Sequence, residues 1–69
     1  PANHFITIDP NENFGQLDLT FFDTMGKLMM RKVINGKTTV DISFPHGIYY
    51  LRIEENGILV DNPGKIIVQ

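Results

Sequence analysis

The side chains that could carry out chemistry are few, and their spacing argues against catalysis. Ser43 is the only serine in the chain, and His46 follows it three residues later. A serine becomes a nucleophile only when a third group orients its histidine partner and an oxyanion hole stabilises the intermediate. No Gly-x-Ser-x-Gly turn surrounds Ser43, as one would in a common hydrolase site. We therefore predict no catalytic residue, and we expect Ser43 to hydrogen-bond the backbone of its own loop.

The histidine and acidic side chains form no recognisable metal-binding pattern. His4 and His46 lie far apart, and the absence of cysteine excludes disulfides and thiolate ligands. The stretch Asp9–Glu12 lacks the twelve-residue ligand pattern of a calcium loop and is typical of a solvated turn. Glu54 and Glu55 are neighbours on a predicted strand, so they point to opposite faces of the sheet. We predict no metal site and no cofactor.

Charge and hydropathy exclude two classes of partner. The net charge of −2 provides no basic surface for a nucleic-acid duplex. The longest apolar runs, such as Ile66–Val68, are far shorter than the roughly 20 residues of a membrane-spanning helix. We therefore predict no nucleic-acid binding and no membrane insertion. The cationic residues that gather around one predicted hairpin, which we interpret as a solvated strand face, are Lys27, Arg31, Lys32 and Lys37.

The elements that must position these residues are strands. The chain contains nine isoleucines, four valines and five threonines but a single alanine, a composition that favours pleated strands over helices. Short alternating runs are separated by Gly, Asn, Asp and Pro, and 69 residues suffice for one domain only. The sequence predicts a single all-β domain over residues 1–69, an antiparallel sandwich of about seven short strands. These strands are His4–Ile8, Leu17–Phe22, Lys27–Val33, Thr38–Ile42, Ile48–Glu54, Ile58–Val60 and Lys65–Val68.

Turn chemistry predicts the register of the strands. We expect a four-residue loop at Asp23–Gly26 with Gly26 left-handed, a three-residue loop at Ile34–Gly36 and a two-residue turn at Asn56-Gly57. The resulting cross-strand pairs are Phe21 with Leu28, Leu19 with Met30, Met30 with Val40, Leu28 with Ile42, Ile53 with Val60, and Glu55 with Ile58.

This register divides the apolar residues between two faces. Phe22, Met29, Tyr50 and Ile67 fall on the outward face, where they form either a patch or a set of scattered surface residues. Both interpretations remain open. The predicted core consists of Ile6, Ile8, Leu17, Leu19, Phe21, Leu28, Met30, Val40, Ile42, Tyr49, Leu51, Ile53, Val60, Ile66 and Val68.

Several short motifs follow one another along the chain: Pro1-Ala2, Asp23-Thr24-Met25-Gly26-Lys27, Val40–Ser43, Gly47-Ile48-Tyr49-Tyr50-Leu51, and the closing Lys65–Gln69. Their order resembles that of the type A C-terminal sorting domains of the type IX secretion system of Bacteroidetes. That family typically shows an opening Tyr-Pro-Asn-Pro-Ala, a central Asp-x-x-Gly-Lys, a Gly-x-Tyr-x-Leu segment and a terminal Lys-x-x-Val-Lys. The matching motif residues, most of which we interpret as structural, are Pro1, Ala2, Asp23, Gly26, Lys27, Gly47, Tyr49 and Leu51.

The resemblance implies an immunoglobulin-like sandwich that performs no catalysis and acts as a secretion signal. It implies an upstream cargo domain, passage through the periplasm to the cell surface, an outer-membrane translocon and a sortase that removes the domain. The first half of the opening motif and the cleavage junction are expected upstream of Pro1. Gln69 stands where the family often has a basic residue.

The resemblance places the sorting signal in the terminal strand, which comprises Lys65, Ile66, Ile67, Val68 and Gln69. An edge strand with unpaired amides is open to a receptor that adds a strand to it. We hypothesise that the secretion machinery reads Lys65, Ile66 and Val68 together with the terminal carboxylate. In a competing interpretation, Ile66 and Val68 merely complete the core.

Two other functions remain open. A carbohydrate- or surface-binding module appended to an enzyme would need a planar aromatic platform, for which Phe22 and Tyr50 are the outward candidates. A purely structural spacer between domains is the third interpretation.

Overall fold

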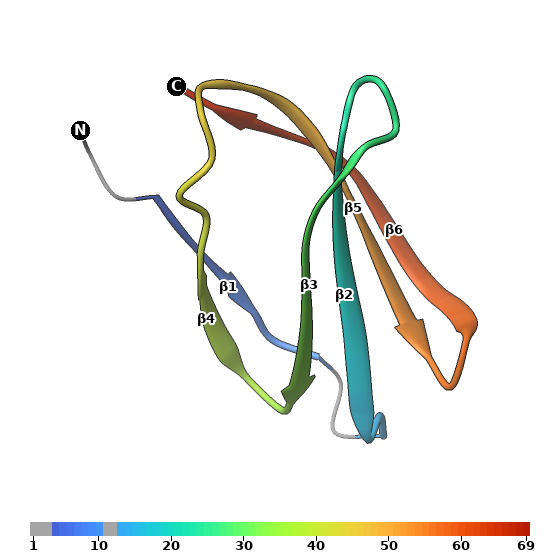
Figure 1. The fold of residues 1–69 in the computed structure, drawn as a ribbon. Coiled ribbons are helices and arrows are strands. Elements are labelled where there is room, and N and C mark those ends of the chain that lie inside the picture. The colour runs from blue at the N-terminus through green and yellow to red at the C-terminus, as the bar shows by residue number, and fades with distance from the viewer. Residues whose placement is uncertain (1–3, 11–12) are drawn as a thin grey trace.

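The computed structural model describes residues 4–10 and 13–69, and every regular element in them is a strand. Strands β1 and β4 form one sheet, and the other four form a second sheet in the order β3-β2-β5-β6. Figure 1 shows the two-stranded sheet beside β3 of the larger sheet. All ladders are antiparallel, so the predicted immunoglobulin-like β-sandwich is confirmed. The strands are β1 (Phe5–Ile8), β2 (Gln16–Asp23), β3 (Leu28–Asn35), β4 (Thr38–Asp41), β5 (Gly47–Glu55) and β6 (Ile58–Val68).

The last two predicted strands, Ile58–Val60 and Lys65–Val68, are the two halves of one bulged strand, β6. Its pairing with β5 shifts twice, between Leu51 and Ile53 and between Ile53 and Glu54. The turn before β6 has Asn56 at φ 51° and Gly57 at φ 82°, the left-handed conformations that a two-residue hairpin turn requires. Glu55 pairs with Ile58, as predicted. The expected pair of Ile53 with Val60 is wrong, because the bulge places Asp61 opposite Ile53.

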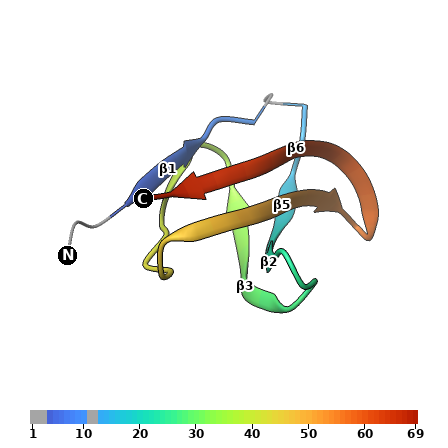
Figure 2. The same cartoon turned by 90° about the horizontal axis from the view of Figure 1, so that it is seen from above.

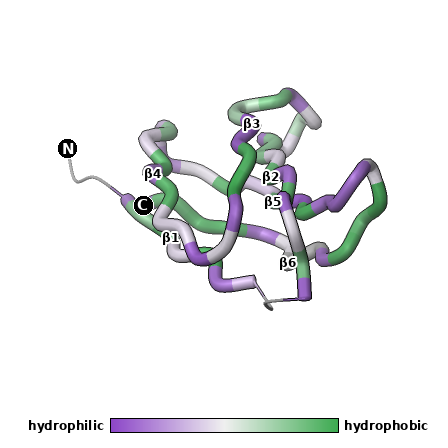
Figure 3. Tube along the Cα trace, turned by 90° about the horizontal axis from the view of Figure 1, so that it is seen from below, coloured by the Kyte–Doolittle hydropathy of each residue, from purple (hydrophilic) through white to green (hydrophobic). Residues whose placement is uncertain are grey.

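Alternation between the two faces is strict in β5. Tyr49, Leu51 and Ile53 are buried, whereas Tyr50 and Arg52 are exposed. Side chains of successive strand residues point to opposite faces, and Figure 3 shows hydrophobic and hydrophilic residues alternating along the chain. One face of the four-stranded sheet therefore packs on the core, and the other faces solvent.

The core lies between the two sheets. Buried residues of β2, β3, β5 and β6 meet Val40 and Ile42, which come from the end of β4 and just beyond it. Of the predicted core residues Leu28 is wrong, since it is 53% exposed. Ile34 is buried, and Met29 and Phe44 pack against the core, although none of them was predicted there. The ten buried residues are Leu17, Leu19, Phe21, Ile34, Val40, Ile42, Tyr49, Leu51, Ile53 and Val68.

The β2–β3 hairpin has a different register from the predicted one. The Asp23 carboxylate accepts hydrogen bonds from the backbone N–H groups of Met25 (2.9 Å) and Lys27 (2.8 Å), so the loop extends one residue further. Gly26 adopts the predicted left-handed conformation, at φ 83°. Phe22 then pairs with Leu28, and a bulge shifts the remaining pairs. The expected pairs of Phe21 with Leu28 and of Leu19 with Met30 are wrong, since Phe21 faces Met30 and Leu19 faces Lys32.

The predicted β3–β4 hairpin does not form. Instead, the chain changes sheet after β3, and β4 pairs with β1, so that Val40 lies opposite Ile6. The expected pairs of Met30 with Val40 and of Leu28 with Ile42 are therefore wrong. The physical reason is Ile34, which was assigned to a loop but is only 2% exposed. The crossing lets both Ile34 and Val40 face the core from opposite sheets.

Candidate recognition surface

The residues considered for catalysis and metal binding are not arranged for either within the described part of the chain. Ser43 Oγ donates a hydrogen bond to the Asp41 carboxylate (2.7 Å). The predicted bond from Ser43 to the backbone of its loop is therefore wrong. Glu55 accepts from the N–H of Gly15, whereas Glu54 is 3.5 Å from Arg52. Among the residues that the structure describes, no three His, Cys, Asp or Glu side chains gather around a possible metal position. No helix in residues 4–10 and 13–69 could span a membrane. The calcium-loop candidates Asn11 and Glu12 lie outside the described residues.

The tail, Lys65–Gln69, comprises the end of β6 together with Gln69 and occupies an edge of the four-stranded sheet. β6 pairs with β5 on one side, and no ladder forms on its other side within the described residues. The end of the tail lies beside the start of β1, as Figure 2 shows. There the His4 imidazole Nε2 donates a hydrogen bond to the main-chain oxygen of Gln69 (3.1 Å). The tail is therefore paired with β5 along one edge, and its last residue is hydrogen-bonded to His4.

The side chains of the tail point alternately outward and into the core. Lys65, Ile67 and Gln69 are exposed, and Ile67 is 60% exposed. Val68 is 4% exposed, and Ile66 packs partly buried against the core. A partner that approaches the outward face of the tail thus contacts Lys65, Ile67 and Gln69. Ile66 and Val68 hold the tail against the sandwich.

An apolar surface adjoins the tail on the outward face of the four-stranded sheet. Cross-strand partners share a face, so the pairs of Leu28 with Phe22, Phe22 with Tyr50, and Tyr50 with Lys65 form one row across all four strands. Ile48 pairs with Ile67 in the next row. Leu28, Ile48, Tyr50 and Ile67 are all exposed, and Phe22 is half-buried. We call the set Phe22, Leu28, Ile48, Tyr50 and Ile67 the outer patch.

A charged row bounds the outer patch on the same face. Arg31 donates to the Asp18 carboxylate at 3.0 Å, and Arg52 lies 3.5 Å from Glu54. Thr20 lies between the two arginines, as the cross-strand partner of both. The outward face is thus divided into an apolar end, which includes the tail, and a charged middle. Of the predicted outward residues, Phe22, Tyr50 and Ile67 belong to the patch, whereas Met29 packs against the core.

Tyr49 and Gly47 build a corner beside the tail. The Tyr49 hydroxyl donates to the backbone oxygen of Pro45, and its ring packs on Phe44 with centroids 4.8 Å apart. Gly47 lies against the Tyr49 ring, because a Cβ built there would be 3.6–3.8 Å from the ring and hydroxyl atoms. Gly47 also pairs with Val68. The expected core position of Tyr49 is confirmed, and the corner supports the end of β6.

Removal of this hydroxyl gives a direct test of the corner. We expect Tyr49→Phe to destabilise the domain by about 1 kcal/mol, because the part-buried hydrogen bond to the Pro45 carbonyl is lost. Tyr50→Phe is the matched control, since Tyr50 is exposed on the outer patch and should shift stability by less than about 0.5 kcal/mol. Urea unfolding of both variants measures the difference. Equal midpoints for the two variants would contradict the assigned role of the hydroxyl.

The fold brings some of the predicted site residues together and separates others. Gly47 and Tyr49 meet the tail directly, whereas the turn of Asp23, Gly26 and Lys27 lies at the end of the β2–β3 hairpin. Leu51 is a core residue. Pro1 and Ala2 lie outside the described residues. Sequence reasoning missed His4 as a partner of the tail, because the contact joins residues 65 positions apart and leaves no local signal.

Comparison with known proteins identifies one family. A family model described as "Secretion system C-terminal sorting domain" matches residues 1–69. Neither a search of curated proteins nor a search of solved structures found a match.

Proposed function

Because the chain belongs to the family of secretion system C-terminal sorting domains, we propose that its tail half of β6 is the part that the type IX machinery contacts. The family match makes the chain a sorting signal for type IX secretion, which exports proteins to the cell surface or the extracellular space. The proposal concerns how this chain presents that signal. The observation that carries it is the edge position of β6, with Lys65 and Ile67 facing solvent next to the outer patch.

Recognition at this edge would use two kinds of contact. A receptor strand added to β6 would bond the main-chain groups of its free edge, which gives affinity without depending on side chains. The outward side chains Lys65 and Ile67 would supply specificity. Ile66 and Val68 would act indirectly, by holding the tail in strand conformation. This assignment combines the two interpretations of the tail, because alternate residues serve the receptor and the core.

The proposal extends to the fate of the domain. The domain transforms no molecule itself, and cargo precedes it in the chain. It crosses the periplasm with that cargo, engages the outer-membrane translocon, and is removed by a sortase at a junction upstream of Pro1. Membership of the sorting-domain family supports all of these steps. A signal that is removed from its cargo must also fold without contacts that are specific to one cargo.

A matched pair of substitutions on one strand tests the contact. A fluorescent reporter fused upstream of the domain is expressed in a host that has a type IX system. Ile67→Asp is expected to lower export about tenfold, which corresponds to the loss of a contact worth about 1.4 kcal/mol. Ile58→Asp is the control, because Ile58 is also exposed on β6 but lies at the opposite end of the strand.

Export is read as reporter fluorescence in the medium and on washed cells, and urea unfolding shows that both variants fold. Equal export of the Ile67→Asp and Ile58→Asp fusions would overturn the proposed contact. The carbohydrate-binding interpretation is tested separately on a glycan array. Phe22 and Tyr50 are cross-strand neighbours, so specific glycan binding that is lost in Tyr50→Ala would favour that alternative.

A further inference from the structure

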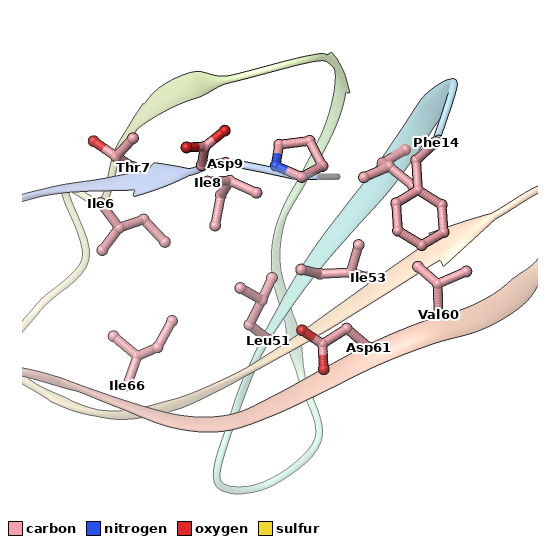
Figure 4. A pocket seen from close by; sticks show the side chains of 12 residues that line it. Ile6, Thr7, Ile8, Asp9, Phe14, Leu51, Ile53, Val60, Asp61 and Ile66 are labelled. Carbon is pink, nitrogen blue, oxygen red and sulfur yellow. The ribbon is translucent and has the colours of Figure 1, made fainter. Parts of the chain in front are cut away.

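An apolar groove opens between β1 and the β5–β6 hairpin, on the side of the sandwich opposite the outer patch. It has a volume of about 480 Å³, within the range of ligand-binding clefts. Figure 4 shows Ile6 and Ile8 of β1 above the groove and Leu51, Ile53 and Ile66 below it. The groove therefore borders the core, with the half-buried Ile6, Ile8 and Ile66 along it and the buried Leu51 and Ile53 beneath.

The groove exists because the two sheets differ in width. The two strands of the smaller sheet face a sheet of four strands. β1 and β4 cannot cover all of its inner face, and the lining shows that the uncovered part lies over β5 and β6. At one end the His4–Gln69 hydrogen bond joins β1 to β6. Asp9 and Asp61 also line the groove.

Among the described residues, β1 pairs with β4 alone, so the main-chain groups along its other edge, which borders the groove, have no ladder partner there. Ile42 N–H donates to the oxygen of His4, its direct partner across the ladder. Hydrogen-bonded and non-hydrogen-bonded pairs alternate in an antiparallel ladder, so Thr7 and Thr39 form a non-hydrogen-bonded pair. Their hydroxyl groups lie 3.3 Å apart, as the closer approach of such pairs allows. The N–H and C=O of Thr7 therefore point away from β4, toward the position that a third strand of this sheet would occupy.

We propose that the groove is a docking site for an extended peptide strand of a partner protein, with alternating apolar side chains and a lysine or arginine. The strand adds to the free edge of β1 as a third strand of the smaller sheet. Its apolar side chains cover the half-buried Ile6, Ile8 and Ile66, and its basic residue approaches Asp9. Asp9 is exposed and lines the groove, and among the described residues no lysine, arginine or histidine lines it, so the charge complement at Asp9 is cationic.

The chemistry of the groove favours a peptide over an acyl chain. An acyl chain would use the apolar floor but would leave the main-chain groups of β1 unpaired, and its carboxylate or phosphate head would meet Asp9. An extended peptide can make all three interactions: apolar contacts with the floor of the groove, hydrogen bonds with the main chain of β1, and an ion pair with Asp9. The proposal is independent of the sorting function, because it concerns the opposite side of the β6 strand and is tested by direct binding.

A pair of proline substitutions makes the test specific. Proline lacks the N–H group and is tolerated on edge strands. Thr7→Pro removes an N–H from the groove edge of β1, whereas Thr39→Pro removes the equivalent N–H from the far edge of β4. Both variants lose the same hydroxyl contact. The probe is a fluorescein-labelled peptide, Lys-Val-Thr-Val-Thr-Val-Lys, titrated with the 69-residue chain and followed by anisotropy.

We expect Thr7→Pro to weaken peptide binding about tenfold, the effect of one lost hydrogen bond, and Thr39→Pro to leave it unchanged. Asp9→Asn is expected to weaken binding about twofold to fivefold, as for an exposed ion pair, and to have no effect on a probe with glutamine in place of lysine. Absence of peptide binding at millimolar concentration, or equal effects of the two prolines, would overturn the proposal. Binding of dodecanoate without binding of the peptide would identify the groove as an acyl site and would likewise overturn it.

Discussion

Removal of Lys65–Gln69 is expected to reduce export of a fused reporter to background and to weaken the fold at the same time. The deletion removes the outward side chains of the tail, the edge that a receptor strand would pair with, and the His4–Gln69 hydrogen bond. It also removes Val68 from the core, and the lost burial of a valine side chain alone costs about 2 kcal/mol. Reporter fluorescence in the medium and urea unfolding of the isolated domain measure the two effects.

A destabilised domain with an intact tail separates these effects. Ile34 is buried in β3, on the opposite edge of the sheet from β6. Ile34→Ala should destabilise the domain by about 2–5 kcal/mol while it leaves Lys65–Gln69 in place. We expect a folded population of this variant to remain exportable. Direct recognition of the tail would be refuted by either of two results. One is export that falls in proportion to the loss of stability in both variants, and the other is normal export of the truncated fusion.

The largest effect on stability is expected for Phe21→Ala. Phe21 is fully buried, and its ring meets Phe44 edge-on with centroids 5.8 Å apart. Truncation of a buried phenylalanine costs about 3–5 kcal/mol, because it removes apolar contacts and leaves a cavity. At about 0.05–0.15 kcal/mol per residue, a domain of this size has a total stability of about 3–10 kcal/mol. The substitution should therefore remove most of the stability or unfold the domain.

Phe5→Ala is the control for this experiment. Phe5 has the same side chain on β1, but it is 58% exposed, and its removal should change stability by less than about 0.5 kcal/mol. Circular dichroism at increasing urea concentration compares the midpoints with that of the parent domain. If the midpoint of Phe21→Ala matched that of Phe5→Ala, the assignment of Phe21 to the centre of the core would be wrong.

Local patterns predicted the strands better than the pairing between them. The alternation of Tyr49, Leu51 and Ile53 and the turn at Asn56-Gly57 are local, and both appear in the structure as expected. The same alternation in β3 and β4 is compatible with a hairpin or with a change of sheet. Only the burial of Ile34 distinguishes the hairpin from the change of sheet. Extending the alternation of inward residues beyond Met30 would have predicted that Ile34 is buried.

The candidate site was predictable to a similar extent. The edge position of the tail was expected, although its strand is the second half of the longer β6, and the division between outward Ile67 and inward Val68 follows from the period of two. The contact of His4 with Gln69 and the groove under β1 arise from how the two sheets meet. Residues distant in sequence make both features, so no single motif indicates them.

The position of β6 in the chain also sets the order of assembly. It is the last strand in sequence, it pairs only with β5 among the described elements, and it contributes Val68 to the core. Two of the other ladders join residues far apart, such as Phe5 with Asp41 and Asp18 with Glu54, and long-range pairing slows folding. The sandwich therefore cannot complete its core before Val68 pairs with Gly47 and is buried.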